Sequence, residues 1–263
     1  MSLDTNYKIS KTGNAYILYD AAIIAEPALQ IFDADYHTNK QAQQNNSTAG
    51  AASGKTGIGR ARVVYFTHDD KALVLKHYYR GGAVASLFKD RYLGFSVVKT
   101  RAFKEWRLLK KMQQLGLPVP QAVAAHVRKS LLFYTADLIT EEIKQARTLA
   151  DVLSETRIEA AQWRKIGACI RLFHQHDVYH ADLNARNILL AATAQHPRPE
   201  TGDVYLIDFD NSGFRPGSGS WKMANLARLK RSLLKFKRND AGFNFDEGDW
   251  SALLAGYKSG VAE

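Results

Sequence analysis

The sequence predicts an α+β fold in two lobes, because strand-like segments dominate the first half of the chain and helix-like segments the second. The chain has 263 residues, and 46% of them are hydrophobic, which is enough for one large domain or two intimate lobes. We expect an N-terminal lobe over residues 1–139, with an antiparallel sheet and one main helix. A reduced, mostly helical C-terminal lobe is expected over residues 140–263.

Strands of the N-terminal lobe are indicated by apolar residues that alternate or run continuously over short segments. The segments with this pattern are residues 15–19, 62–66, 72–77 and 131–139. The polar residues 68–71 predict a turn that joins the second and third segments into a β-hairpin. Before this hairpin, the low-complexity stretch QAQQNNSTAGAASGKTGIG at residues 41–59 is interpreted as a mobile loop.

Helices are indicated by apolar residues at helical spacing and by the helix breakers that follow them. Residues 100–115 are the expected helix of the N-terminal lobe, since Gly116 and two prolines come soon after. In the C-terminal lobe, residues 157–174 and 221–237 each carry an apolar stripe. Between these two segments, residues 204–207 predict a short buried strand.

The composition restricts the compartment and the class of partner. The single cysteine, Cys169, excludes a disulfide framework and fits a reducing compartment. No apolar run approaches the roughly 20 residues needed to span a bilayer, and the first residues lack a hydrophobic signal segment. We therefore expect a soluble cytoplasmic protein. The formal net charge of +10 favours an anionic partner, either a nucleotide, a nucleic acid or membrane lipid.

The most informative stretch is YHADLNARNILL, at residues 179–190. It contains Asp182 and Asn187 in the pattern H-x-D-L-x-x-x-N, and Asp208 directly follows the short strand of the same lobe. An alcohol that attacks phosphorus needs its hydroxyl oriented and its proton accepted, which suits a carboxylate such as Asp182 on a rigid loop. Asn187 and Asp208 supply hard oxygen ligands, which Mg²⁺ prefers. The pattern favours phosphoryl transfer from ATP, with Asp182 catalytic and Asn187 and Asp208 as metal ligands.

Two neighbours of these residues have more ordinary interpretations. Asp210 is expected to be a turn residue, because Asp208 is the acid that directly follows the strand. His180 is expected to be a partly buried structural histidine that braces the loop by hydrogen bonding.

Lys76 lies at the end of an apolar segment whose alternation places it on the same strand face as Val74. A small apolar residue two positions before a lysine leaves room for a flat base beside an ammonium that reaches phosphates. Glu105 shares the apolar stripe of the helix at residues 100–115, and an acid on an inward stripe is unfavourable unless it is paired. We therefore predict a Lys76–Glu105 ion pair that takes part in catalysis and nucleotide binding.

A glycine-containing loop precedes the hairpin. Gly57 and Gly59 come directly before a strand, where glycines let backbone N–H groups approach phosphate oxygens closely, so both are candidates for cofactor binding. The preceding GKT triplet is not a Walker A motif, because Ala49 stands where the first glycine is required and no helix follows.

The residues singled out above occur in an order that resembles the protein-kinase-like superfamily over nearly the whole chain: Lys76, Glu105, Asp182, Asn187 and Asp208. This resemblance implies a bilobal protein-kinase-like fold with ATP bound between the lobes. It also implies that backbone groups of Ile139, Thr140 and Glu141 contact the adenine.

Two departures from that superfamily argue against a protein substrate. Only 55 residues follow Asp208, too few for a full activation segment and the helices behind it, and no Ala-Pro-Glu motif occurs there. The long stretch between Lys76 and Glu105 instead carries basic and aromatic side chains that suit a sugar with carboxylate or phosphate groups.

Finer detail narrows the resemblance to one family. The strings KHYYRGG, TRAFKEWRLL, LGLPVPQAVAA, HADLNARNILL and LIDFDNSGFRPGSGSWKMANLARLKRSL are similar to the bacterial 3-deoxy-D-manno-octulosonic acid (Kdo) kinases, among the lipopolysaccharide core kinases. The family implies ATP-dependent phosphorylation of the 4-hydroxyl of a Kdo residue on a lipid A precursor. It also implies peripheral association with the cytoplasmic face of the inner membrane. Residues 215–238, with eight Lys or Arg and no acid, fit an anionic membrane surface.

Several alternatives stay open at this point. A heptose kinase of the same pathway shares the motifs, whereas aminoglycoside- or choline-type kinases bind cationic substrates and are disfavoured by the +10 charge. An inactive kinase-fold scaffold is disfavoured because every expected catalytic position is filled. A nucleic-acid binder is suggested by alternating aromatic and basic residues at 88–106, but no reading motif accompanies them.

Overall fold

The computed structural model describes residues 7–38, 63–79, 92–93, 96–217 and 219–259. The chain forms two compact units, which are described separately below. Unit 1 comprises residues 1–110 and 121–142, and unit 2 comprises residues 111–120 and 143–263. The division near residue 142 differs slightly from the expected one at residue 139, and the short segment at residues 111–120 groups with the later part of the chain.

Unit 1 is built on an antiparallel sheet in the order β1-β2-β6-β7-β4-β3, with β5 also paired to β7. The strands are β1 (Tyr7–Thr12), β2 (Ala15–Asp20), β3 (Val63–His68), β4 (Lys71–His77), β5 (Tyr92–Leu93), β6 (Ala122–Ser130) and β7 (Phe133–Glu141). The β3–β4 hairpin confirms the hairpin expected from the sequence. Its turn residues Asp69 and Asp70 both have positive φ angles, 47° and 59°, which is the conformation of a two-residue turn that matches strand twist.

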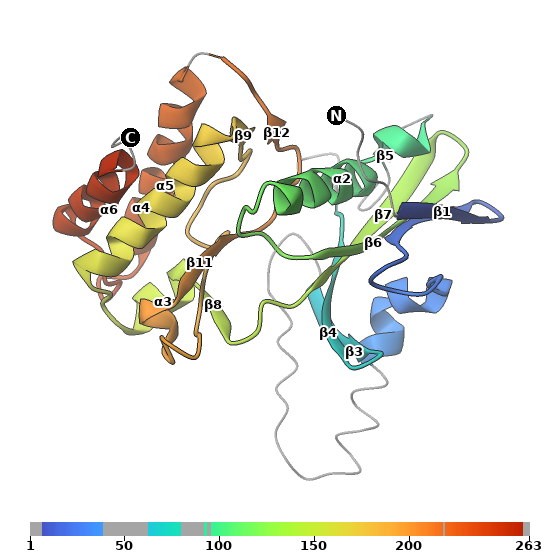
Figure 1. Cartoon of the computed structure of the whole chain (residues 1–263), viewed down its shortest axis with the longest axis horizontal. Helices are drawn as coiled ribbons and strands as arrows, with labels where there is room; N and C mark the ends of the chain where they lie inside the picture. Colours follow the sequence, from blue (N-terminus) through green and yellow to red (C-terminus); the bar gives the residue numbers. More distant parts are fainter. Residues whose placement is uncertain (1–6, 39–62, 80–91, 94–95, 218, 260–263) are drawn as a thin grey trace, which may run out of the picture. The chain divides into compact units, whose positions relative to one another are not determined.

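The sheet of unit 1 has two different faces. Alternate residues of β4, Leu73 and Leu75, point into a core shared with β2 and with the 3-10 helix η1 (Leu29–Phe32). Lys76 belongs to the opposite set. Helix α2 (Arg101–Gln114) lies across the sheet in Figure 1, and its buried stripe includes Trp106 and Leu109 at helical spacing.

Unit 2 contains most of the helices. Its helices are α3 (Leu149–Glu155), α4 (Ala160–Gln175), the 3-10 helix η4 (Pro199–Thr201), α5 (Ser220–Asn239) and α6 (Glu247–Ser259). Its short strands are β8 (Ala146–Thr148), β9 (Val178–Tyr179), β10 (Ile188–Ala191), β11 (Asp203–Leu206) and β12 (Gly213–Phe214). They form two small sheets, ordered β11-β10-β8 and β12-β9, which hold the chain on either side of the residues discussed next.

Helices α4 and α6 pack directly against each other in unit 2, as Figure 1 also shows. Glycines make the approach possible: a Cβ on Gly256 would lie 2.1 Å from the Arg164 carbonyl oxygen, and one on Gly167 would lie 2.0 Å from the Leu253 carbonyl oxygen. None of the helices in the described part of the chain is long and apolar enough to cross a bilayer.

Candidate active site

The loop at residues 180–187 connects β9 to β10 in unit 2 and carries Asp182. His180, which is almost fully buried, braces this loop. Its Nδ1 accepts a hydrogen bond from the Asp182 amide at 3.1 Å, so its Nε2 carries the proton and donates to the Ile207 carbonyl at 2.9 Å. The side chain of Asp182 is 61% exposed, so its carboxylate is accessible from solvent.

Strand pairing brings Asn187 and Asp208 to the same end of a small sheet. Ile188 on β10 pairs with Leu206 on β11, and the next amide along, that of Ile207, donates to the Asn187 carbonyl at 3.0 Å. The Asn187 side-chain amide donates to the Asp182 carbonyl at 2.9 Å, which turns its Oδ1 into the atom suited to a metal. Asn187 comes just before β10, and Asp208 comes just after β11, its antiparallel partner. The strand pairing therefore brings two residues that are far apart in the sequence to the same end of the sheet.

The backbone at Asp208 is held in an uncommon conformation. Its φ is 63°, in the left-handed region that non-glycine residues seldom adopt, and such outliers cluster at functional sites. The next residue, Phe209, fixes this geometry because it is buried between the rings of Phe173 and His180, with centroid separations of 5.7 and 4.7 Å. Asp210 is a central residue of the turn closed by the bond from the Ser212 amide to the Phe209 carbonyl, as its interpretation as a turn residue requires.

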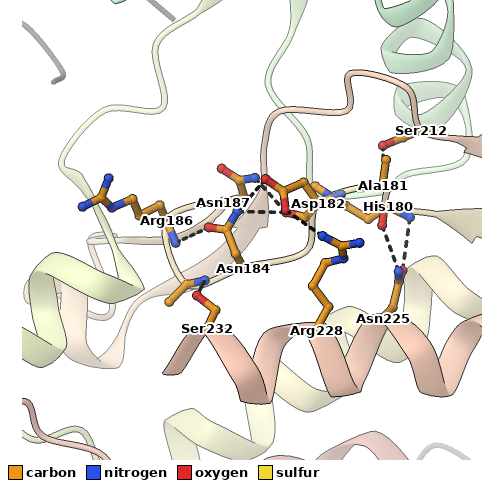
Figure 2. Close-up of polar contacts among 11 residues, drawn as sticks. His180, Ala181, Asp182, Asn184, Arg186, Asn187, Ser212, Asn225, Arg228 and Ser232 are labelled. Atoms are coloured by element: carbon orange, nitrogen blue, oxygen red, sulfur yellow. Dashed lines mark hydrogen bonds and ion pairs between the residues drawn. The ribbon is translucent and has the colours of Figure 1, made fainter. Parts of the chain in front are cut away.

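Helix α5 holds the 180–187 loop through side chains one or two turns apart, Asn225, Arg228 and Ser232 (Figure 2). Buried Asn225 makes two bonds to the His180 backbone, accepting from its amide at 3.2 Å and donating to its carbonyl at 2.9 Å. Ser232 Oγ accepts from the Ala185 amide at 3.3 Å. Asn225, Arg228 and Ser232 are spaced three and four residues apart, so they share one face of α5.

The two carboxylate oxygens of Asp182 have different partners. Arg228 Nη1 lies 3.3 Å from Oδ1, and Asn184 Nδ2 donates to Oδ2 at 3.1 Å (Figure 2). These contacts set the direction of the carboxylate. Sequence reasoning missed Asn225, Arg228 and Ser232, because their only local signal was a basic amphipathic helix.

Unit 1 contains the expected ion pair. Lys76 Nζ lies 3.0 Å from both carboxylate oxygens of Glu105, which is only 3% exposed. Tyr78 adds a hydroxyl that donates to Glu105 Oε2 at 2.5 Å, and its ring lies 4.6 Å from the Lys76 ammonium. In the sequence analysis, Tyr78 fell within the stretch between Lys76 and Glu105 that was expected to bind the sugar. Nothing in the sequence indicated its hydrogen bond to Glu105. The catalytic role of the pair stays a prediction.

The residues expected to contact adenine are buried or already paired within the sheet. Ile139 is fully buried in the middle of the sheet, where it pairs with Leu75. The Glu141 amide already donates to the Gln121 carbonyl at 2.9 Å, and Thr140 pairs with Val74. Adenine binding by residues 139–141 therefore stays a prediction. It could involve only those backbone groups of the segment that make no hydrogen bond within the sheet. Gly57 and Gly59 lie outside the described residues.

A metal ion fits the donor chemistry of Asn187 and Asp208. Within the described residues, no group of three or more His, Cys, Asp or Glu side chains is arranged to hold a metal. A site made of Asn187 and Asp208 supplies one amide and one carboxylate oxygen, so phosphate oxygens and water would complete the shell that Mg²⁺ prefers.

The fold places the chain among proteins with an α+β kinase-like architecture. A solved structure titled "WaaP in complex with acyl carrier protein" superposes with a TM-score of 0.52, covering 80% of this chain and 79% of that one, at 19% sequence identity.

Sequence comparison identifies the family within that class. The model of the lipopolysaccharide kinase (Kdo/WaaP) family matches residues 55–257, and the chain belongs to this family. It is 44% identical over 186 residues to the 3-deoxy-D-manno-octulosonic acid kinase of Actinobacillus succinogenes, covering 70% of this chain and 75% of that protein. It is 36% identical over 247 residues to the enzyme of the same name from Vibrio vulnificus strain YJ016, covering 94% and 96%.

Proposed function

We propose that this protein is an ATP-dependent kinase that phosphorylates the 4-hydroxyl of a Kdo sugar on a lipid A precursor, in lipopolysaccharide inner-core biosynthesis. The observation that carries the proposal is the 180–187 loop, whose Asp182 is exposed and braced beside Asn187 and the strained Asp208. Family membership and full-length similarity to proteins named Kdo kinase supply the acceptor.

The residues divide the work as follows. Bound ATP supplies the phosphoryl group, and Mg²⁺ neutralises the charge on its oxygens. Asp182 orients the acceptor hydroxyl and accepts its proton, while the contacts from Asn184 and Arg228 hold the carboxylate in one direction. Asn187 Oδ1 and the Asp208 carboxylate would hold the metal. In unit 1, Glu105 keeps the Lys76 ammonium in place to bind phosphate oxygens.

The acceptor is tested directly by mass spectrometry. The purified protein is incubated with Mg²⁺-ATP and lipid A precursors that carry no Kdo, one Kdo, two Kdo units, or Kdo plus heptose. We expect a mass increase of one phosphoryl group only on the Kdo-bearing lipids, with the phosphate at the 4-position by tandem fragmentation. Phosphate on heptose would identify a heptose kinase instead. Asp182→Ala protein, purified in parallel, controls for contaminating kinases.

We further propose that the outward face of α5 binds the anionic surface of the inner membrane. Met223 and Leu234 are 59% and 43% exposed on this face, although both are large and apolar. Arg231, Lys235 and Arg238 are exposed beside them and make no ion pair within the described residues. Exposed apolar side chains among cations are typical of helices that lie on anionic membranes, where each cation contributes about 1 kcal/mol.

Other cations of α5 are engaged inside the protein and are unsuited to this role. Lys230 pairs with Glu247 at 2.8 Å, and Lys237 donates to the carbonyls of Ala241 and Phe243 at 2.9 and 2.7 Å. A test of the surface should therefore leave these lysines unchanged.

Liposome co-sedimentation tests this surface with the variant Arg231→Glu/Lys235→Glu/Arg238→Glu. We expect its binding to vesicles containing anionic lipid to fall at least about 100-fold, because three favourable charges of about 1 kcal/mol each are lost and reversed. The control, Lys8→Glu/Arg128→Glu/Lys144→Glu, makes the same change in net charge at exposed positions elsewhere. If both variants lost vesicle binding equally, or if neither variant lost it, α5 would be excluded as the docking face.

A further inference from the structure

The Arg228–Asp182 contact is a poor candidate for a purely structural ion pair. Its two side chains are 45% and 61% exposed, and a single N–O distance of 3.3 Å joins them. Exposed pairs of this kind contribute little to folding. In the part of the chain that the structure describes, Arg228 makes no other side-chain hydrogen bond, so four of its five N–H donors have no partner there.

We propose that Arg228 binds the carboxylate of the acceptor sugar and thereby determines that the acceptor is a sugar acid. This inference rests on the proposed function and names the residue that recognises the acid group. A guanidinium matches a carboxylate in shape and can bind it through two parallel hydrogen bonds.

The chemistry of the acceptor creates the need for such a residue. The Kdo carboxylate is attached to C2, and only the C3 methylene separates C2 from C4, which carries the acceptor hydroxyl. When that hydroxyl contacts Asp182, two carboxylates come close together near the phosphate oxygens of the nucleotide. Like charges at this separation repel one another unless a cation lies between them.

Arg228 is placed to supply that cation. It already contacts Asp182 Oδ1, so an acceptor carboxylate bound by its remaining donors would lie beside the carboxylate that receives the hydroxyl proton. Figure 2 shows its side chain extending from α5 toward the loop. The helix is fixed at this point by Asn225 one turn earlier and Ser232 one turn later, which limits the movement of Arg228. A neutral sugar would gain nothing from this cation.

The test combines two forms of the acceptor with changes at Arg228. The acceptors are a soluble Kdo glycoside and its methyl ester, which lacks the negative charge. Binding is measured by calorimetry in the presence of Mg²⁺ and a non-hydrolysable ATP analogue, and turnover is measured with ATP. The variants are Arg228→Gln, Arg228→Lys, and the control Arg164→Gln, an exposed arginine on α4. Thermal unfolding checks that each variant is folded.

We expect the wild type and the Arg164→Gln control to prefer the acid over the ester by about 10- to 100-fold, the usual effect of a charged hydrogen bond. Arg228→Gln should lose this preference by weakening acid binding alone, and Arg228→Lys should restore part of it. Equal effects of Arg228→Gln on acid and ester, or none on either, would overturn the proposal.

Binding and turnover separate this inference from the proposed function. Acid selectivity that depends on Arg228, without any phosphorylated product, would support acid recognition and contradict the kinase assignment. Product formation with equal use of acid and ester would support the kinase and contradict the role of Arg228.

Discussion

At the scale of single residues, Glu105 is a buried acid whose carboxylate is paired with Lys76 and accepts a hydrogen bond from the Tyr78 hydroxyl. Lys76→Met should lower kcat/KM for ATP by about 10²–10³-fold, the usual loss when one charged donor to a transition state is removed. It should also destabilise unit 1, because breaking a buried pair costs about 3–5 kcal/mol. ATP kinetics and urea unfolding measure the two effects.

A second variant separates catalysis from stability. Lys76→Met/Glu105→Gln removes the buried charge along with its partner and should recover much of the lost stability without recovering ATP use. Wild-type kinetics in either variant would contradict the assignment of Lys76.

The sequence allows candidate site residues to be proposed where the expected chemistry restricts their type and spacing. Asp182 and Asn187 are recognisable because both lie on one short loop, and Asp208 because it follows a short apolar strand. Arg228 was not recognisable, because it is 46 residues away from Asp182 and meets it only through the packing of α5. A basic helix with an apolar stripe gives no indication of which cation faces the loop.

At the scale of secondary-structure elements, the contact between α4 and α6 depends on glycine. Gly256→Ala would place a Cβ 2.1 Å from the Arg164 carbonyl oxygen, so the helices must separate. Overpacking costs about 1–3 kcal/mol, and the better helix propensity of alanine returns up to about 1 kcal/mol. We therefore expect the free energy of unfolding to fall by about 1–2 kcal/mol in a denaturant titration.

Gly219→Ala is the matched control for this substitution. Among the described residues, a Cβ at Gly219 meets only the flexible Lys222 side chain, at 4.0 Å, so the stability should change little. Unchanged or increased stability of Gly256→Ala would show that the two helices do not depend on this close approach.

Elements with clear periodicity were predicted from the sequence, and others were missed for physical reasons. The hairpin β3–β4 and the helices α2, α4 and α5 agree with expectation to within a few residues. Strand β6 was missed because residues 122–127 are buried without alternation and include three alanines, which have low strand propensity. Helix α6 was missed because it has little apolar periodicity and contains two glycines, which lower helix propensity.

At the scale of the whole molecule, the excess positive charge has more than one use. The chain carries a formal net charge of +10, and α5 alone uses its cations in three ways. Arg228 faces Asp182, and Lys230 and Lys237 bind within unit 2. The exposed Arg231, Lys235 and Arg238 are the cations proposed above to bind an anionic surface. Net charge predicted an anionic partner, but only the packing of α5 distinguishes these roles.

The division into two units could not be predicted fully from local sequence patterns. Residues 111–120 include the last residues of α2, yet they group with unit 2, where the Pro118 carbonyl accepts from the Leu206 amide at 3.1 Å. Long-range contacts of this kind have no counterpart in periodicity or turn signals.

The central claim is that Asp182 acts on the acceptor hydroxyl beside a metal held by Asn187 and Asp208. The most direct measurement compares phosphoryl transfer from Mg²⁺-ATP to a Kdo-bearing lipid A precursor by wild type, Asp182→Ala and the exposed control Asp203→Ala, with nucleotide affinity measured in parallel. We predict that Asp182→Ala loses at least about 10²–10⁴ in kcat while ATP binding and the control stay near wild type. Turnover by Asp182→Ala within tenfold of wild type (about 1.4 kcal/mol of barrier) would contradict the account.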